Sequence, residues 1–312
     1  MSFRFFIYYC ALWGGWAAFL GWIPGRLVTI QRSVVATDGI RGMCLGMLVA
    51  LGLSIVDSIW NLSLRQFGQI FLRVTIAVVV GCVGGLMGGL IGSFLYTKTT
   101  WIGFIIVGWT FTGFLIGTSI GVFEILSSLV RQQDMSGSRR KLVNGMLGGT
   151  VGGILGGVLF VLLNTVWVGL FKDKTRDQLL SPSALGFVIL GMCIGLLIGL
   201  AQVNFKEAWI KVESGFRAGR EKILTKEEIT IGRAESCDIG LFGDSMIERL
   251  HARILKRGND YYVMDAGTPH GTFLNGRQVS RPELLQSGDA IKVGNCVLRF
   301  GERQKRKQVQ GI

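Results

Sequence analysis

The chain has 312 residues, of which 49% are hydrophobic and 17% charged, with 46 glycines and only four prolines. Soluble globular domains have about 25% charged residues, so this composition excludes an ordinary soluble protein. The net charge of +13 contains no long basic run, which argues against a nucleic-acid partner. Residues 1–205 hold 14 Lys and Arg with 6 Asp and Glu, whereas residues 206–312 hold 19 and 14, so we divide the chain near residue 205.

Six apolar segments in the first part are long enough to be membrane-spanning helices, because a span takes about 20 such residues. They cover about 5–24, 42–60, 74–96, 101–127, 143–171 and 184–203. The first is too long for a signal peptide and is interpreted as an uncleaved helix. We therefore predict an all-α bundle of six transmembrane helices over residues 1–205, in contact with a lipid bilayer.

A pattern of small residues recurs in the second, fourth and sixth predicted helices. Small residues stand at every fourth position, and a polar residue follows three positions later: Gly46, Ala50, Ser54 and Asp57; Gly113, Gly117, Gly121 and Glu124; Gly191, Gly195, Gly199 and Gln202. The third and fifth helices share "GGLMGG" (84–89) and "GGILGG" (152–157), and the first has a fainter "GGWAAFLG". Such glycine zippers let helices pack closely in a membrane. We predict three repeated hairpins, whose glycine faces also suit a homo-oligomer.

The polar residues that end these patterns, Asp57, Glu124 and Gln202, allow two interpretations. Acidic side chains inside a membrane often mark a transport path. Yet both carboxylates lie near helix ends, and Arg65 and Arg131 follow close by in the sequence. The alternatives are a structural bundle with paired carboxylates and a channel or transporter with a path at its centre.

Residues from about 210 onward change to short alternating strands separated by Gly, Asn and Asp, which predicts a small all-β sandwich. The segment contains no constellation of catalytic residues and no phosphate-cradling glycine loop, so we expect no enzymatic activity and no cofactor. The chain has six cysteines without a CxxC motif, and the two histidines, His251 and His270, have no cysteine nearby, so we expect no metal site.

The segment 210–302 resembles the forkhead-associated (FHA) family. The resemblance rests on "SGFRAGRE" before the second strand, "IGR" (231–233), "HARI" (251–254) and "DAGTPHGTFLNG" (265–276). It implies that residues 206–302 form a β-sandwich that binds phosphothreonine peptides through loops at one end. Residues 303–312 follow as a basic C-terminal tail. The resemblance does not extend to the helices.

The family's phosphate-binding positions carry over one residue at a time. Arg233 matches the arginine that clamps the phosphate, a task that suits a guanidinium fork. Arg249 stands where a residue often assists with the phosphate or peptide. Glu248 stands where the family has a serine that contacts the phosphate, and Pro269 and His270 replace the usual threonine and asparagine.

The remaining matches concern the binding loops themselves. His251 matches the histidine that ties these loops together, and Gly232, Gly271 and Gly276 are structural positions. Asn275 belongs to the second Asn-Gly of the motif, and we include it among the candidate partner-binding residues with Arg233, Glu248, Arg249 and His270.

The glutamate at position 248 changes what this pocket can bind. A serine hydroxyl donates a hydrogen bond to phosphate, whereas an ionised carboxylate only accepts. Either Glu248 points away and leaves the phosphate to Arg233 and Arg249, or it pairs with them as a substitute for phosphate. His270 is able to donate in place of the asparagine.

We expect a multi-pass protein of the cell membrane that acts as a signalling scaffold. An even number of spans places both termini on one side, and the charges of the loops do not decide which. The FHA resemblance favours the cytoplasm, where the partner protein, phosphorylated on threonine or not, would be found. The alternative is a channel or transporter that the FHA-like domain regulates.

Overall fold

A computed structural model describes residues 3–27, 33–61, 67–131, 136–171 and 182–303, except 217, 225 and 259. Arg65 and most of the predicted basic tail (304–312) lie outside the described residues, as does the side chain of Arg131. The chain forms two compact units, one of helices and one built around the residues from 206 onward. Each unit is described by itself.

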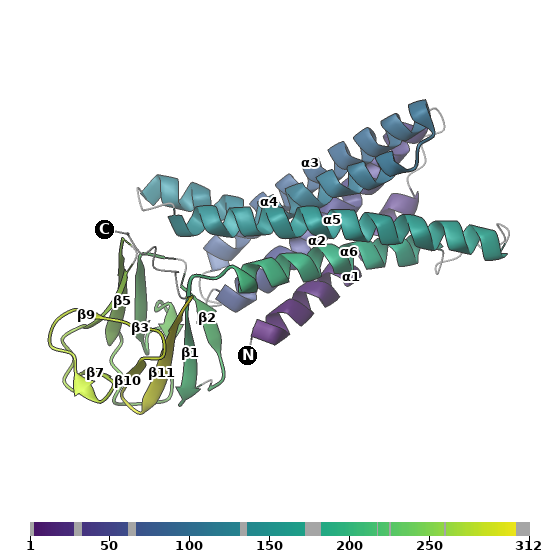
Figure 1. Cartoon of the computed structure of the whole chain (residues 1–312). Helices are drawn as coiled ribbons and strands as arrows, with labels where there is room; N and C mark the ends of the chain where they lie inside the picture. Colours follow the sequence, from purple (N-terminus) through teal and green to yellow (C-terminus); the bar gives the residue numbers. More distant parts are fainter. Residues whose placement is uncertain are drawn as a thin grey trace, which may run out of the picture. The chain divides into compact units, whose positions relative to one another are not determined.

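Six helices make up the first unit (Figure 1). They are α1 (Phe3–Leu27), α2 (Val34–Asn61), α3 (Phe67–Thr99), α4 (Gly103–Arg131), α5 (Ser136–Phe171) and α6 (Pro182–Asn204). All six are long enough and apolar enough to cross a membrane. Most exceed the predicted segments, because helix formation continues beyond the apolar run. For example, Ser33 caps α2 by accepting a hydrogen bond from the Ala36 amide (3.2 Å). The helix therefore begins at Val34, eight residues before the predicted start at residue 42.

Glycine faces bring the helix backbones into direct contact. A Cβ atom added at Gly149 of α5 would overlap the carbonyl oxygen of Gly113 on α4. The same close approach joins α2 to α3 at Gly42 and Gly85, and α1 to α6 at Gly14 and Gly191. The even-numbered zippers thus pack against the double glycines of α3, α5 and α1.

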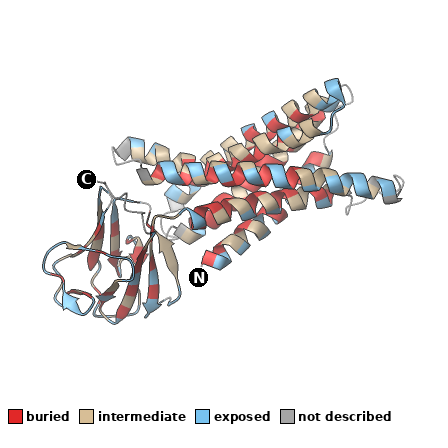
Figure 2. Cartoon of the chain, viewed as in Figure 1, coloured by how far each residue is buried: buried red, intermediate tan, exposed pale blue. Residues whose placement is uncertain are grey.

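The double-glycine helices also pack closely on a second side. Added Cβ atoms at Gly92 of α3 and Gly152 of α5 would press on backbone atoms of α4 and α6, respectively. In Figure 2, buried residues concentrate where the helices meet. Close contacts at glycines therefore occur on two sides of both α3 and α5.

The second unit is a sandwich of two β-sheets (Figure 1). The first has the order β2-β1-β11-β10-β7-β8 and the second β4-β3-β5-β6-β9. The strands are β1 (Ala208–Ser214), β2 (Glu221–Ile223), β3 (Glu228–Gly232), β4 (Ile239–Gly240), β5 (Ala252–Arg257), β6 (Asp260–Asp265), β7 (Thr272–Leu274), β8 (Arg277–Gln278), β9 (Glu283–Leu284), β10 (Ala290–Val293) and β11 (Cys296–Glu302).

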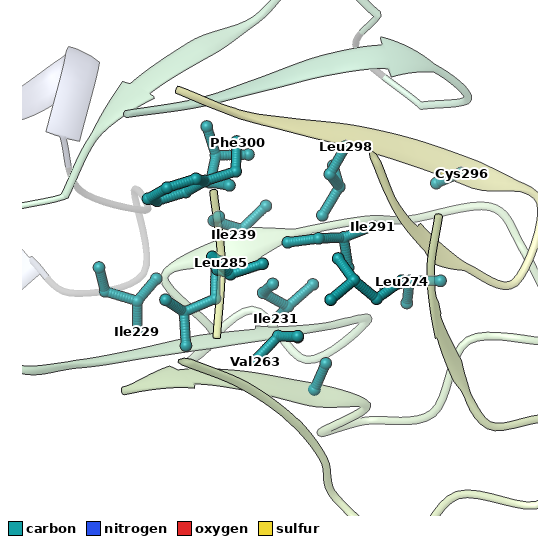
Figure 3. Packing of buried hydrophobic residues seen from close by; sticks show 14 of the residues in the cluster. Ile229, Ile231, Ile239, Val263, Leu274, Leu285, Ile291, Cys296, Leu298 and Phe300 are labelled. Atoms are coloured by element: carbon teal, nitrogen blue, oxygen red, sulfur yellow. The ribbon is translucent and has the colours of Figure 1, made fainter. Parts of the chain in front are cut away.

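Alternate residues of the strands fill the space between the sheets. Ile231 and Val263 from one sheet meet Ile291, Leu298 and Phe300 from the other, and each is at most 1% exposed (Figure 3). This alternation is what the sequence predicted for a sandwich. A core of this kind holds the strand ends, and therefore the loops between them, in fixed positions.

The glycine contacts predict how α5 responds to one added methyl group. We expect Gly149→Ala to lower the melting temperature of the full-length protein in detergent, because the methyl group would overlap Gly113 of α4. Gly169→Ala is the matched control on the same helix, since nothing lies within 4 Å of its Cβ position. That control should be neutral or slightly stabilising, by about 1 kcal/mol at most. Equal effects of the two substitutions would contradict close packing at Gly149.

Candidate functional site

Three loops at one end of the sandwich hold the residues that the FHA motif singles out. They follow β3, precede β5, and connect β6 with β7. The first two are joined by backbone hydrogen bonds: the Arg233 amide donates to the Glu248 carbonyl (2.9 Å), and the Ala234 amide donates to the Arg249 carbonyl (3.0 Å). A side chain at Gly232 would overlap the Arg249 carbonyl, which explains why a glycine precedes the arginine.

The side chains of Arg233 and Glu248 face each other across these two loops. The Nη2 atom of Arg233 lies 3.8 Å from Oε2 of Glu248, and the two side chains are 49% and 38% exposed. A solvent-exposed ion pair contributes only about 0–1 kcal/mol to stability. The pair therefore does little to hold the fold, yet it places a carboxylate next to the guanidinium that the family uses to clamp phosphate. Arg249 is exposed beside it.

His251 ties the loops together from inside the domain. Its ring is fully buried; Nδ1 accepts a hydrogen bond from the Glu248 amide (3.1 Å), and Nε2 lies 3.1 Å from the Gly271 carbonyl. Because Nδ1 is an acceptor, the proton of the neutral ring is on Nε2, which donates to Gly271. This geometry gives His251 the structural role that the resemblance implied.

Asp265 organises the third loop. Its carboxylate accepts hydrogen bonds from the amides of Gly267 and Thr268 and from the hydroxyls of Thr268 and Thr272. Burial acts to raise the pKa of Asp265, but these hydrogen bonds outweigh it and the pKa is lowered. Gly271 ends the loop with a φ of +65°, a conformation that favours glycine.

The tip of this loop and the Asn-Gly turn behave differently. Pro269 and His270 are exposed at the tip and face solvent. The Asn275 side chain, in contrast, donates to Asp289 (2.8 Å) and accepts from the Ala290 amide (2.9 Å). Asn275 has a φ of +49° and Gly276 one of +84°, as their turn requires. The structure thus shows the Asn275 amide hydrogen-bonded to Asp289 and Ala290 within the domain.

A second cluster of charges lies inside the helical unit. The Arg73 guanidinium of α3 donates through Nη1 to Asp57 of α2 (2.8 Å) and through Nη2 to Glu124 of α4. The Lys141 ammonium of α5 lies 2.7 Å from Asp57 and 2.8 Å from Glu124. We call these four residues the charge quartet. The side chains of Arg73, Lys141 and Asp57 are at most 5% exposed, and that of Glu124 is 17% exposed.

Gln202 adjoins the charge quartet, so all three polar residues from the zipper pattern come together. Its side-chain amide donates to the Lys141 carbonyl (3.1 Å). The quartet contains two positive and two negative charges and is neutral as a whole. Each carboxylate is paired with both cations, although Oε2 of Glu124 and Nε of Arg73 are buried without a hydrogen-bond partner among the described residues.

From the sequence, Arg65 and Arg131 were the candidate partners of these carboxylates. In the structure, the partners are Arg73 and Lys141, which the sequence analysis did not predict. One signal was available. Arg73 stands eleven residues before Gly84, and Lys141 stands eleven before Gly152, the first glycines of the two matching motifs. The two cations therefore occupy equivalent positions. Among the described residues, no group of His, Cys, Asp and Glu side chains is placed to hold a metal ion.

Comparison with known proteins identifies the sandwich. Residues 229–294 match the family model for the FHA domain, so the C-terminal part of this chain is an FHA domain. FhaB of Mycobacterium tuberculosis, an FHA domain-containing protein, is 27% identical over 142 residues, which are 45% of this chain and 91% of that protein. An oxoglutarate dehydrogenase inhibitor of Corynebacterium jeikeium is 34% identical over 93 residues, or 30% of this chain and 63% of that protein.

Part of this chain is also similar to solved structures of FHA domains. The FHA domain of the CT664 protein from Chlamydia trachomatis covers 32% of this chain and 100% of its own, with 22% identity and a TM-score of 0.30. The FhaA FHA domain, solved in complex with an intracellular domain, matches 30% of this chain over 98% of its own length, with 24% identity and a TM-score of 0.28.

The charge quartet predicts a characteristic pattern of mutant stabilities. Lys141→Met leaves a buried negative charge without compensation and should destabilise the bundle by about 3–5 kcal/mol. Adding Glu124→Gln restores a neutral cluster, in which Arg73 and Asp57 still pair, so the double variant should recover much of that loss. Unfolding of the full-length protein in detergent measures both. A double variant that is as unstable as the two single variants combined would contradict a coupled quartet.

Proposed function

We propose that this protein is a membrane-embedded scaffold whose FHA domain recruits a protein partner. The FHA assignment supports a protein ligand, because the family mediates phosphothreonine-dependent protein interactions. The corynebacterial relative is named for inhibiting an enzyme, which also favours a protein over a nucleic acid or a small molecule. The six apolar helices support a membrane anchor. We place the FHA domain and both termini in the cytoplasm, where phosphothreonine and its kinases occur.

The charge quartet favours an anchoring role for the helices over transport. A channel with Asp57 and Glu124 along its path would expose these carboxylates to water. Instead, Asp57 is 3% exposed, and both carboxylates are paired with Arg73 and Lys141. No observation on the described helices favours a path, and we propose none.

The observation that carries the recruitment proposal is the contact between Arg233 and Glu248. A carboxylate lies 3.8 Å from the guanidinium that the resemblance assigns to phosphate binding. Two unit charges about 4 Å apart interact with about 4 kcal/mol at an effective dielectric constant of 20, and exposure reduces this value. Glu248 would repel a phosphate about as strongly as Arg233 attracts it. We infer that Glu248 is a built-in anion and that the native partner binds without phosphate.

Three exposed residues then form the recognition surface: Arg233, Arg249 and His270. They carry hydrogen-bond donors, and one of them, Arg233, lies next to the Glu248 carboxylate. A partner that supplies a neutral hydrogen-bond acceptor, such as a backbone carbonyl or a side-chain amide, binds these donors without the repulsion from Glu248 that an anion meets. The expected ligand is therefore a polar, unphosphorylated segment of a cytoplasmic protein.

Peptide binding by the fragment 206–312 tests this proposal. We expect the native fragment to show no preference for phosphothreonine peptides over matched unphosphorylated ones. Glu248→Ser removes the repulsion and restores a donor, so it should raise affinity for the phosphopeptides by at least about tenfold, which corresponds to 1.4 kcal/mol. Isothermal titration measures both affinities.

Two further variants complete the test. Glu248→Gln keeps the size of the side chain but removes its charge. It therefore distinguishes electrostatic repulsion of the phosphate from steric exclusion by the side chain. Arg233→Ala in the Glu248→Ser background should abolish the gained phosphopeptide binding. A native fragment that already prefers phosphopeptides, and loses this preference with Arg233→Ala, would show that Glu248 points away from the ligand.

A further inference from the structure

The charge quartet clamps four of the six helices to one another. Arg73 joins α3 to α2 and to α4 through Asp57 and Glu124. Lys141 joins α5 to the same two helices through the same carboxylates. Each of the four helices is thus held by two buried ion pairs, and breaking one member of such a cluster leaves an uncompensated charge.

The other two helices, α1 and α6, are held differently. At the level of the quartet, α6 contributes the neutral Gln202, which makes one hydrogen bond to the Lys141 carbonyl. The position of α1 that matches Arg73 and Lys141, eleven residues before its glycine pair at 14–15, is Phe3, so this repeat lacks a cation. Among the described side chains, no ion pair joins α1 to α6.

What joins α1 to α6 is close contact between small residues. Added Cβ atoms at Gly191 and Gly195 would overlap the backbone carbonyls of Gly14 and Cys10, and one at Gly199 would lie 3.2 Å from the Cβ of Cys10. We call this contact surface the α1–α6 seam. Individual dispersion contacts of this kind are worth only about 0.1–0.2 kcal/mol each, so none of them is comparable to a buried ion pair.

We propose that the α1–α6 seam is the mobile seam of the bundle, with α2–α5 as a rigid frame and Gln202 as the tie that limits the motion of α6. The position of α6 in the chain makes this motion relevant. It ends at Asn204, and β1 of the FHA domain begins at Ala208, so only residues 205–207 separate the two elements. The proposal does not depend on what the FHA domain binds.

Cys10 is a native reporter for the α1–α6 seam. It is 3% exposed, and its Sγ lies 3.5 Å from the Cβ position of Gly199, one turn before Gln202. Ser54→Cys provides a matched reporter in the rigid frame. Ser54 is 1% exposed on α2, one turn before Asp57, and cysteine is nearly isosteric with serine. A thiol at either site reacts only when its surroundings open.

The experiment compares two full-length proteins in lipid nanodiscs, each with a single cysteine, at position 10 or at position 54. Their alkylation by N-ethylmaleimide is followed by intact-protein mass spectrometry. We expect Cys10 to react at least about tenfold faster than the thiol at position 54, a difference of about 1.4 kcal/mol in opening free energy. Equal rates, or a faster reaction at position 54, would overturn the proposal.

Gln202→Leu tests the tie itself. It removes the hydrogen bond to the Lys141 carbonyl while leaving all four charges of the quartet in place. The reaction of Cys10 should accelerate by about another tenfold, and the thiol at position 54 should keep its rate. If Gln202→Leu accelerates both thiols equally, the whole bundle has loosened and the seam is not distinct. If it changes neither, Gln202 is not the tie.

Discussion

A positive charge held against a carboxylate recurs in both units of this protein, and the helical unit depends on it. In the helical unit, Arg73 and Lys141 share Asp57 and Glu124 out of reach of water. In the FHA domain, Arg233 faces Glu248 at the solvent-exposed end of the sandwich. Solvent access gives the two pairings opposite consequences. The buried quartet fixes helix positions because breaking one of its pairs leaves a buried charge uncompensated, whereas the exposed pair contributes little to stability.

This difference links the fold to the proposed function. The sandwich core and His251 hold the recognition loops in place, so Arg233 does not need Glu248 for its position. Glu248 is therefore free to act on the ligand instead, by repelling phosphate and leaving the neighbouring donors to a neutral, unphosphorylated segment. In the bundle, the four charged residues of the quartet come from α2, α3, α4 and α5. Helix α6 contributes the neutral side-chain amide of Gln202 to this cluster. The helix that leads into the FHA domain is thus tied to the quartet by a hydrogen bond from a neutral amide and not by an ion pair.

Much of this could be predicted from the sequence, for identifiable reasons. The six apolar helices are confirmed, since apolar runs report helices directly, and so is the FHA domain, whose motifs lie in contiguous segments. Membrane insertion and the threefold repeat remain predictions. The quartet was missed because its partners come from different helices, with Lys141 lying 84 residues from Asp57. The role of Asn275 was also hidden, because only the structure shows that Asp289 and Ala290 occupy its amide.

The most direct test of the central claim is site-specific photocrosslinking from position 270 in living cells. A photoreactive amino acid in place of exposed His270 would capture whatever contacts the recognition loops. Cells with and without an expressed threonine phosphatase would be compared. We expect the same crosslinked cytoplasmic protein under both conditions. A product that disappears when threonines are dephosphorylated, or a partner from outside the cytoplasm, would contradict phosphate-independent recruitment of a cytoplasmic protein.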